Sequence, residues 1–265
     1  MRRLRHNRDM ASDGANAVPS GVDGVELKVT VGAELVDIVL AAFSLDPAPA
    51  ERRRIWFCEQ LGGHGGPGAL PLLARGIILR VRKRADRADD STLKLRGPEG
   101  CLDPELWHRR TEEFGDLARI EGDWAGNHRL VSASLDAKVE GGRIDEAVAA
   151  RPHQVRRLLS DDQQALAGEL LLGLDGLTLL GPVRARKWGR GAGGLANDVA
   201  AEMWEVDDRL RFLELSMREK DDPLGAQRRL AETIRSRGIQ LAPEQAPKTS
   251  VVLAHFAAAG AAGPH

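Results

Sequence analysis

Apolar and cationic residues alternate along two short stretches in the first half of the chain. Residues 79–84 read Leu-Arg-Val-Arg-Lys-Arg, and residues 91–96 read Ser-Thr-Leu-Lys-Leu-Arg. Successive side chains of a β-strand lie on opposite faces, so this alternation predicts two strands that each have one cationic and one apolar face. The polar, Asp-containing segment 85–90 between them is typical of a hairpin loop. The cationic face of this hairpin carries Arg80, Arg82, Arg84, Lys94 and Arg96.

The same separation of charged and apolar positions recurs in the other strands that the sequence predicts. These strands span residues 25–31, 53–59, 117–124, 179–188, 198–204 and 209–218, and residues 128–135 form another short strand or an irregular connection. Their charged faces carry Glu26, Lys28, Glu121, Asp123, Arg184, Arg186, Glu202, Glu214 and Arg218. Contact with water explains any single face of this kind, but the repetition favours a sheet that encloses its charged side.

Helical periodicity separates several of these strands. Apolar residues at the i, i+3, i+4, i+7 spacing predict an amphipathic helix over residues 33–43. Residues 144–172 are predicted to be helical, with a capping box at residues 160–163, and another helix is predicted over residues 222–238. About seven or eight strands with three or four helices predict an α+β fold whose antiparallel sheet can close into a barrel.

The folded part of the chain is predicted to be one domain, since 265 residues are enough for a sizeable core. Residues 1–22 are polar and rich in Gly, Ala, Asp and Asn, so we expect them to be disordered. Residues 23–256 form the domain, with the helical insertion at 144–172, and the low-complexity residues 257–265 form a flexible tail.

Composition narrows the expected partners and location. The formal net charge is -1 at pH 7, whereas a general nucleic-acid binder is usually basic overall. No run of about 18 apolar residues occurs and no apolar segment follows the charged start, so we expect neither a membrane span nor a secretory signal. Two cysteines without metal-ligand spacing favour a reducing cytoplasm. The absence of Tyr and the Arg- and Ala-rich usage suggest a GC-rich bacterial genome.

Closure of the sheet around the cationic hairpin requires compensating carboxylates, bound metal and an anionic ligand. Two cations about 6 Å apart repel each other by about 3 kcal/mol at an effective dielectric constant near 20. A triphosphate, with about four negative charges and many acceptor oxygens, matches the forked donors of arginine. Carboxylates on the same face would hold Mg²⁺ or Mn²⁺, which prefer oxygen ligands, polarise phosphoryl groups and activate water.

Other conspicuous residues have simpler explanations. The Gly-rich segment 62–66 is not followed by the Lys-Ser/Thr pair of a phosphate-binding loop, so a flexible connection is the better interpretation. The histidines show no metal-ligand spacing, and Cys58 lies in a predicted strand, where burial is expected. The segment 184–188 is basic enough to contact nucleic acid, but strand alternation accounts for it without that partner.

Six motifs, in their order and spacing, resemble those of the CYTH or triphosphate tunnel metalloenzyme superfamily. The strands at 76–84 and 91–96 match its Gly-[Ile/Val]-x-Leu-Arg-x-Arg and Thr-x-Lys-x-Arg patterns. The other motifs are Val-Glu-Leu-Lys at 25–28, Glu-Gly-Asp at 121–123, Leu-Glu-Leu-Ser at 213–216 and Lys-Thr at 248–249. The resemblance runs from about Val25 to Leu253 and looks closest to the longer bacterial members, which insert a helical region after the fifth strand.

This resemblance implies an eight-stranded antiparallel tunnel that binds triphosphates with a divalent metal, Mg²⁺ or Mn²⁺. Members hydrolyse inorganic tripolyphosphate, nucleoside triphosphates or thiamine triphosphate, and some cyclise ATP. By resemblance, the metal ligands or water-orienting acids are Glu26, Glu121, Asp123 and Glu214. The residues that would bind the phosphates are Lys28, Arg80, Arg82, Lys94, Arg96, Arg184 and Arg218.

One position departs from the family pattern. The family's first strand reads Glu-x-Glu-x-Lys, but its first acidic position is Gly24 here. The sequence therefore leaves several functions open: a metal-dependent triphosphatase, an adenylyl cyclase, or a polyphosphate- or nucleotide-binding module without turnover. An anion-binding or RNA-interacting module without a tunnel is a further alternative. The motifs contact only phosphates, so they do not select among triphosphates.

Overall fold

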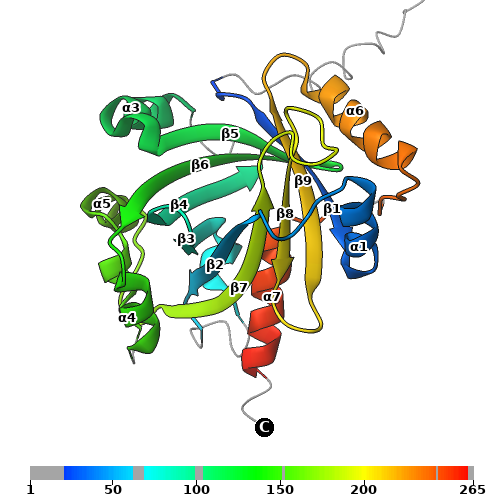
Figure 1. Ribbon diagram of the computed structural model, residues 1–265. Coiled ribbons are helices and arrows are strands. Elements are labelled where there is room, and N and C mark those ends of the chain that lie inside the picture. Colours follow the sequence, from blue (N-terminus) through cyan, green and yellow to red (C-terminus); the bar gives the residue numbers. More distant parts are fainter. Residues whose placement is uncertain (1–20, 62–68, 99–103, 151–152, 243, 262–265) are drawn as a thin grey trace, which may run out of the picture.

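A closed barrel surrounded by helices forms the folded part of the chain (Figure 1). The structure, a computed structural model, describes residues 21–61, 69–98, 104–150, 153–242 and 244–261. The predicted disordered segment 1–22, except its last two residues, the Gly-rich segment 62–66 and the end of the predicted tail lie outside these residues. In the described ranges, no helix is both long and apolar enough to cross a membrane.

Nine described strands build the barrel. They are β1 Val25–Gly32, β2 Glu51–Glu59, β3 Ile77–Arg84, β4 Asp89–Pro98, β5 Ala118–Ala125, β6 His128–Val139, β7 Thr178–Trp188, β8 Ala200–Glu205 and β9 Arg211–Glu219. Their order around the wall is β1-β5-β6-β4-β3-β2-β7-β8-β9, and β9 pairs with β1 to close it. The closed α+β barrel confirms the predicted fold class.

The barrel differs from the expected eight antiparallel strands in count and in one pairing. The segment at 128–135, left open between a strand and an irregular connection, belongs to the twelve-residue strand β6. In addition, β1 pairs in parallel with β5 and antiparallel with β9. The N-terminal strand therefore fills the gap between two strands that are far from it in the sequence.

Helices cover the outside of the barrel and one of its ends (Figure 1). They are α1 Ala33–Ala42, α2 Pro71–Ala74, α3 Pro104–Phe114, α4 Arg143–Ala149, α5 Asp161–Glu169, α6 Pro223–Ser236 and α7 Lys248–Ala261, with single 3-10 turns at η2 Gly115–Leu117 and η3 Val155–Leu158. Elements α4, η3 and α5 fall in the helical region predicted at 144–172. Helix α7 continues through Ala261, past the point where the sequence predicts a tail.

The outer face of the barrel is apolar because it packs against these helices. Leu79 and Leu93 project from β3 and β4 into a core that includes Ile144 of α4 and Leu166 of α5. A second core, on the opposite side, places the outer residues of β1, β8 and β9 under α1 and α6. Each fully buried aliphatic side chain contributes about 1.5–3 kcal/mol. Because the apolar side chains must face outward to be buried under the helices, the charged side chains that alternate with them face the interior of the barrel.

The predicted capping box attaches the helical insertion to the barrel. The Ser160 hydroxyl accepts a hydrogen bond from the Gln163 backbone N–H at 3.2 Å, and the Gln163 side chain accepts one from the Ser160 N–H at 3.1 Å. Gln163, which is fully buried, also accepts from the Ser91 hydroxyl at 2.8 Å and donates to the Leu135 carbonyl at 2.8 Å. The box therefore both starts α5 and satisfies polar groups of β4 and β6.

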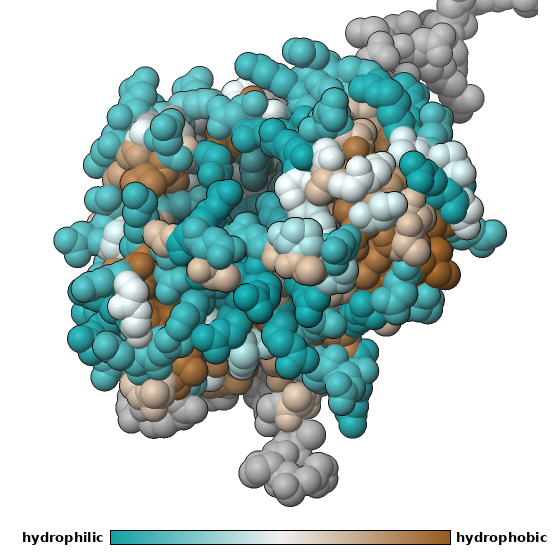
Figure 2. Space-filling view, in the orientation of Figure 1, coloured by the Kyte–Doolittle hydropathy of each residue, from teal (hydrophilic) through white to brown (hydrophobic). Residues whose placement is uncertain are grey.

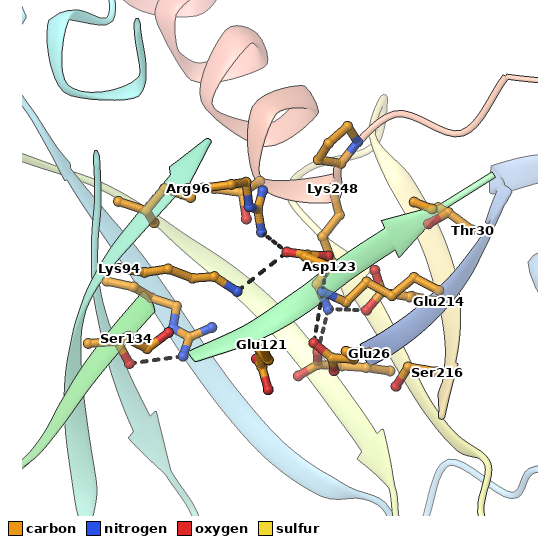
Figure 3. A pocket seen from close by; sticks show the side chains of 18 of the residues that line it. Glu26, Thr30, Lys94, Arg96, Glu121, Asp123, Ser134, Glu214, Ser216 and Lys248 are labelled. Carbon is orange, nitrogen blue, oxygen red and sulfur yellow. Dashed lines mark hydrogen bonds and ion pairs between the residues drawn. The ribbon is translucent and has the colours of Figure 1, made fainter. Parts of the chain in front are cut away.

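Helix α7 closes one end of the barrel interior. Its residues Val252 and Leu253 pack with Phe57 and Trp204, which project inward from β2 and β8. The first residue of the helix, Lys248, extends into the space beyond this apolar cluster (Figure 3). The interior is thus apolar next to α7 and charged farther along the barrel.

Candidate functional site

The barrel encloses a cavity of about 320 Å³, which is in the size range of small-molecule sites. Side chains from all nine described strands and from α7 line it. The face of the molecule in Figure 2 is predominantly hydrophilic and is hollowed near its middle. The inward positions of the alternating strands therefore meet in one enclosed space.

Positive charge dominates this cavity. Its cationic side chains, eleven among the described residues, are Lys28, Arg53, Arg80, Arg82, Lys94, Arg96, Arg119, Lys187, Arg190, Arg218 and Lys248. The acidic ones, five in the same part of the chain, are Glu26, Glu121, Asp123, Glu202 and Glu214. The lining thus has six more cations than acids. Three of these cations, Arg53, Arg82 and Arg119, pair with Glu51, Asp90 and Asp136 outside the lining, which leaves three positive charges in excess, whereas the whole chain has a net charge of -1.

Asp123 of β5 is the centre of one cluster of charges (Figure 3). Its carboxylate accepts hydrogen bonds from the Lys28 ammonium at 2.6 Å and from the Lys94 ammonium at 3.4 Å, and it lies 2.7 Å from the Arg96 guanidinium. Lys28 also contacts the Glu26 carboxylate at 2.8 Å. The parallel pairing of β1 and β5 sets Glu26 beside Asp123, so one ammonium reaches both carboxylates.

These contacts keep the cluster ionised at neutral pH. Burial opposes ionisation of Asp123, but Lys28, Lys94 and Arg96 outweigh it and hold the pKa of this carboxyl well below its usual range. Burial also opposes ionisation of Glu26, but Lys28 lowers the pKa of Glu26 to about 2. Burial disfavours the Lys28 ammonium, yet Asp123 and Glu26 raise the pKa of Lys28 above its ordinary value.

Lys248 of α7 is the centre of a second cluster. Its ammonium lies 2.7 Å from the Glu202 carboxylate and 2.8 Å from the Glu214 carboxylate, and Arg53 contacts Glu202 at 3.1 Å. Glu202 and Glu214 are directly opposite each other on β8 and β9, a pairing of like charges that destabilises a sheet unless a cation lies between them. Although burial acts in the opposite direction, these contacts raise the pKa of Lys248 and hold the pKa of Glu202 well below its usual range.

Arg80 of β3 has no carboxylate contact among the ion pairs of the described residues. Its guanidinium donates to the Thr92 hydroxyl at 3.0 Å, and its Nε is buried without an acceptor. Arg96 contacts Asp123, but its Nε and Nη1 are likewise buried without an acceptor. A buried donor that lacks an acceptor costs about 1–3 kcal/mol. Because both arginines line the cavity, an anion inside it would supply the acceptors that they lack.

Three cavity cations are incompletely compensated by the acids of the protein. Burial lowers the pKa of Arg80 to about 10. Burial also lowers the pKa of Lys94, and the contact with Asp123 does not restore it. Burial lowers the pKa of Lys187 as well, although the nearby Glu202 acts in the opposite direction. An additional negative charge in the cavity would stabilise all three cations.

Most of the residues predicted from the sequence meet in this cavity. The predicted acids Glu26, Glu121, Asp123 and Glu214 line it, as do the predicted cations Lys28, Arg80, Arg82, Lys94, Arg96 and Arg218. Arg82 is held by Asp90 at 2.7 Å, and Arg218 lies 3.7 Å from Glu121. The structure establishes their common location, and their roles in binding or catalysis stay predictions.

Arg184 is the exception, because the structure places it outside the cavity. Its side chain is exposed, and neither Arg184 nor Arg186 lines the enclosed space. Lys187, which the sequence places on the opposite face from these two arginines, is the cationic residue of β7 that lines the cavity. The inward-facing positions of this part of β7 are therefore shifted by one residue from those that the sequence predicts.

A β-bulge explains the reversal. Ile55 of β2 pairs with Val183 of β7, whereas Phe57 pairs with Leu180, so β7 contains one residue more than β2 over this interval. Leu180 and Val183 consequently both project into the interior apolar cluster, and every later residue changes face. Gly181 lies within the bulge at a φ of 145°, where a Cβ would be 2.7 Å from the Ile55 carbonyl oxygen.

Five cavity cations were not among the predicted site residues: Arg53, Arg119, Lys187, Arg190 and Lys248. Strand alternation could have identified Arg119, because it lies two residues before Glu121 on β5. It could not have identified Lys248, which begins a helix and reaches the cavity only through the packing of α7.

The carboxylates of the cavity have the right chemistry for Mg²⁺ or Mn²⁺, which prefer oxygen ligands. Their arrangement does not fit such an ion. Within the described ranges, no group of three or more His, Cys, Asp or Glu side chains is placed to hold a metal. Each of the four acids predicted as metal ligands has a lysine or arginine within 4 Å of its carboxylate oxygens. The metal cofactor therefore stays a prediction of the family resemblance.

Comparisons with known proteins support the fold without assigning a sequence family. No family model and no curated protein matches the chain. Among solved structures, the candidate adenylyl cyclase HpAC1 from Hippeastrum, which has a dominant triphosphatase activity, has a TM-score of 0.54 and 14% identity over 86% of this chain and 94% of its own. A candidate adenylate cyclase from Bacillus halodurans has a TM-score of 0.53 and 12% identity over 86% of this chain and 96% of its own.

The chain thus has a CYTH-like fold, an α+β closed barrel of the class that these solved structures share. At this level of identity the comparison establishes the fold and leaves the activity to be argued from the cavity.

Proposed function

We propose that this protein binds a triphosphate group inside its barrel. The observation that carries the proposal is the pair of arginines, Arg80 and Arg96, whose buried N–H groups lack acceptors within a cavity that has an excess of cations. A triphosphate carries about four negative charges and offers many acceptor oxygens. It therefore supplies both the negative charge and the hydrogen-bond acceptors that the cavity residues lack.

The strand arrangement supports a linear chain of phosphates rather than a single one. Arg80 and Arg82 project from β3, and Lys94 and Arg96 project from the adjacent strand β4. Residues two apart on a strand are about 6.6 Å apart, so successive cations are spaced to contact different phosphates. Lys187 of β7, which is separated from β3 only by β2, adds a further cation to the same cavity.

Hydrolysis of the bound triphosphate is the second candidate function, and the carboxylates in the same cavity favour it. A carboxylate such as Glu121 can accept a proton from an attacking water or orient that water. The fold neighbour HpAC1 has a dominant triphosphatase activity. Cyclisation of ATP is the alternative reaction for this fold, and it differs by releasing pyrophosphate and cyclic AMP.

Calorimetry with inorganic tripolyphosphate, ATP and thiamine triphosphate tests the proposal. We expect Arg80→Ala to weaken binding about 100-fold, which corresponds to the loss of about 3 kcal/mol. Arg184→Ala is the matched control, because this arginine is exposed and outside the cavity. Equal affinity of the wild type and Arg80→Ala for all three ligands, or no binding at all, would contradict the proposal.

Product assays with Mg²⁺ or Mn²⁺ then separate the reactions. Phosphate release indicates a triphosphatase, and cyclic AMP with pyrophosphate indicates a cyclase. Binding without either product indicates a module without turnover.

A further inference from the structure

The acidic residues of the cavity have partners that point to a different role from metal binding. We propose that these carboxylates are internal counter-ions of the cavity lysines and arginines, and that the triphosphate binds as the free anion, without a divalent metal. This inference rests on the proposed function, because it concerns the same bound triphosphate.

The Lys28 ammonium occupies the place that a metal shared by Glu26 and Asp123 would need. It lies 2.8 Å from the Glu26 carboxylate and 2.6 Å from the Asp123 carboxylate. The Lys28 side chain is only 12% exposed, so a metal that displaced it would leave a buried ammonium without a partner. Breaking a buried ion pair in this way costs about 3–5 kcal/mol.

The same arrangement occurs a second time on the adjoining strands β8 and β9, since β9 pairs directly with β1. Lys248 lies 2.7 Å from the Glu202 carboxylate and 2.8 Å from the Glu214 carboxylate, and its side chain is 15% exposed. Each of two pairs of neighbouring carboxylates is thus bridged by one buried lysine. The repetition indicates a common function for these acids, which is to neutralise lysines that belong to the barrel wall.

Gly24 removes a further carboxylate from the position where the family pattern has one. Its φ is 150°, a conformation that side chains other than glycine rarely adopt. A Cβ at this position would lie 3.2 Å from the Glu219 carbonyl oxygen and 3.4 Å from Nε of Arg218. Arg218 in turn lies 3.7 Å from Glu121, so this acid also has a cationic neighbour.

The unpaired donors of the cavity favour the free anion. The buried N–H groups of Arg80 and Arg96 that lack acceptors need phosphate oxygens, and a Mg²⁺ ion bound to the triphosphate would occupy some of those oxygens. Mg²⁺ should therefore compete with the cavity for the triphosphate instead of assisting its binding.

Calorimetric titration of inorganic tripolyphosphate, in EDTA and at increasing Mg²⁺ concentration, tests the inference. We expect binding in EDTA, and at least a threefold weaker apparent affinity once Mg²⁺ is in excess over the ligand. Mn²⁺ alone, followed by its electron paramagnetic resonance signal, should show no binding to the ligand-free protein. Binding of tripolyphosphate only with Mg²⁺, or binding of Mn²⁺ to the ligand-free protein, would overturn the inference and leave triphosphate binding standing. Absence of tripolyphosphate binding in both conditions would instead overturn the proposed function.

Variants of the acids supply a second readout. Glu26→Gln removes a negative charge near the cationic wall while Lys28 keeps Asp123 as a partner, so tripolyphosphate should bind several-fold more tightly in EDTA. A metal ligand would give the opposite result, since its loss would weaken metal-assisted binding. Glu232→Gln on α6, an exposed acid outside the cavity, is the matched control and should leave the affinity unchanged. Unchanged or weaker binding by Glu26→Gln in EDTA would count against the counter-ion role.

Discussion

Lys28 and Lys94 contact the same carboxylate, that of Asp123, yet the pKa of Lys28 is raised and the pKa of Lys94 is lowered. Lys28 lies 2.6 Å from Asp123 and has Glu26 as a second acidic partner, and its pKa is raised against the effect of burial. Lys94 is 3.4 Å from Asp123, and burial together with Arg96 and Lys28 lowers its pKa. One carboxylate cannot neutralise three cations, so those with the weaker contact stay short of negative charge.

The second cluster repeats this contrast. Lys248 lies between Glu202 and Glu214, and its pKa is raised. Lys187 pairs with Glu202 across β7 and β8, and burial lowers its pKa despite that neighbour. The comparison separates two kinds of cavity lysine: Lys28 and Lys248 have acidic partners within the protein, whereas Lys94 and Lys187 would be stabilised by the anion that we propose to bind in the cavity.

Acid titration should produce the largest effect, because it discharges the carboxylates of both clusters. The pKa of Glu26 is lowered to about 2 from an ordinary value of about 4.5, and those of Asp123 and Glu202 are also depressed. A depressed folded-state pKa adds stability that is present above the unfolded-state value and is lost as the pH falls through the folded-state value. We therefore expect the free energy of unfolding to decrease steadily between about pH 4.5 and pH 2, as measured by urea denaturation at fixed ionic strength. A free energy of unfolding that stays constant over this interval would contradict the ion-pair network.

Asp123→Asn should give the next largest change, since it removes the shared partner of three buried cations. We expect a loss of about 3–5 kcal/mol in the free energy of unfolding, the magnitude typical of a broken buried ion pair. Urea denaturation of the ligand-free protein measures it. Glu232→Gln, an exposed surface change, should alter stability by less than about 0.5 kcal/mol. A comparable small effect for Asp123→Asn would show that its contacts contribute nothing to folding.

Replacing each lysine of the Asp123 cluster by methionine sharpens the comparison directly. Lys28→Met should destabilise the ligand-free protein by about 2–3 kcal/mol, because the buried Asp123 carboxylate and the half-buried Glu26 carboxylate lose the ammonium that they share. Lys94→Met should leave that stability nearly unchanged and weaken tripolyphosphate binding by about 10- to 100-fold. Denaturation and calorimetry on the same two variants measure both quantities. If the two substitutions change stability equally and also change tripolyphosphate affinity equally, Lys28 and Lys94 do not have different roles.

Much of the barrel was predictable from the sequence because strand alternation is a local property. Outward Leu79 and Leu93 and inward Arg80 and Lys94 follow from the two-residue period once one face must be buried. The parallel pairing of β1 with β5 was not predictable in this way. It depends on which distant strands become neighbours, and neither strand carries a local pattern that encodes its neighbour.

The ion-pair partners of the charged residues could not be predicted from the sequence either. Alternation places Glu26, Lys28 and Asp123 on the inner face, but it does not say that Lys28 bridges the two acids. The family resemblance predicts a metal at such acids, while the structure gives them cationic partners. Lys248 reaches Glu202 only because α7 packs into the end of the barrel, a tertiary contact without a strand-like sequence pattern.

The smallest expected effect tests the β-bulge that exchanges the inward-facing and outward-facing residues of β7. If Lys187 faces the cavity and Arg184 faces outward, Lys187→Ala should weaken tripolyphosphate binding about tenfold, or about 1.4 kcal/mol, while Arg184→Ala should have no effect. Both variants remove one cation from the same strand, so a general change in net charge affects them alike and cancels in the comparison. Calorimetry at two salt concentrations would show this, because a non-specific charge effect is screened and a contact inside the barrel is screened much less. The reverse ranking, with Arg184→Ala the weaker binder, would restore the alternation predicted from the sequence and place the bulge elsewhere on β7.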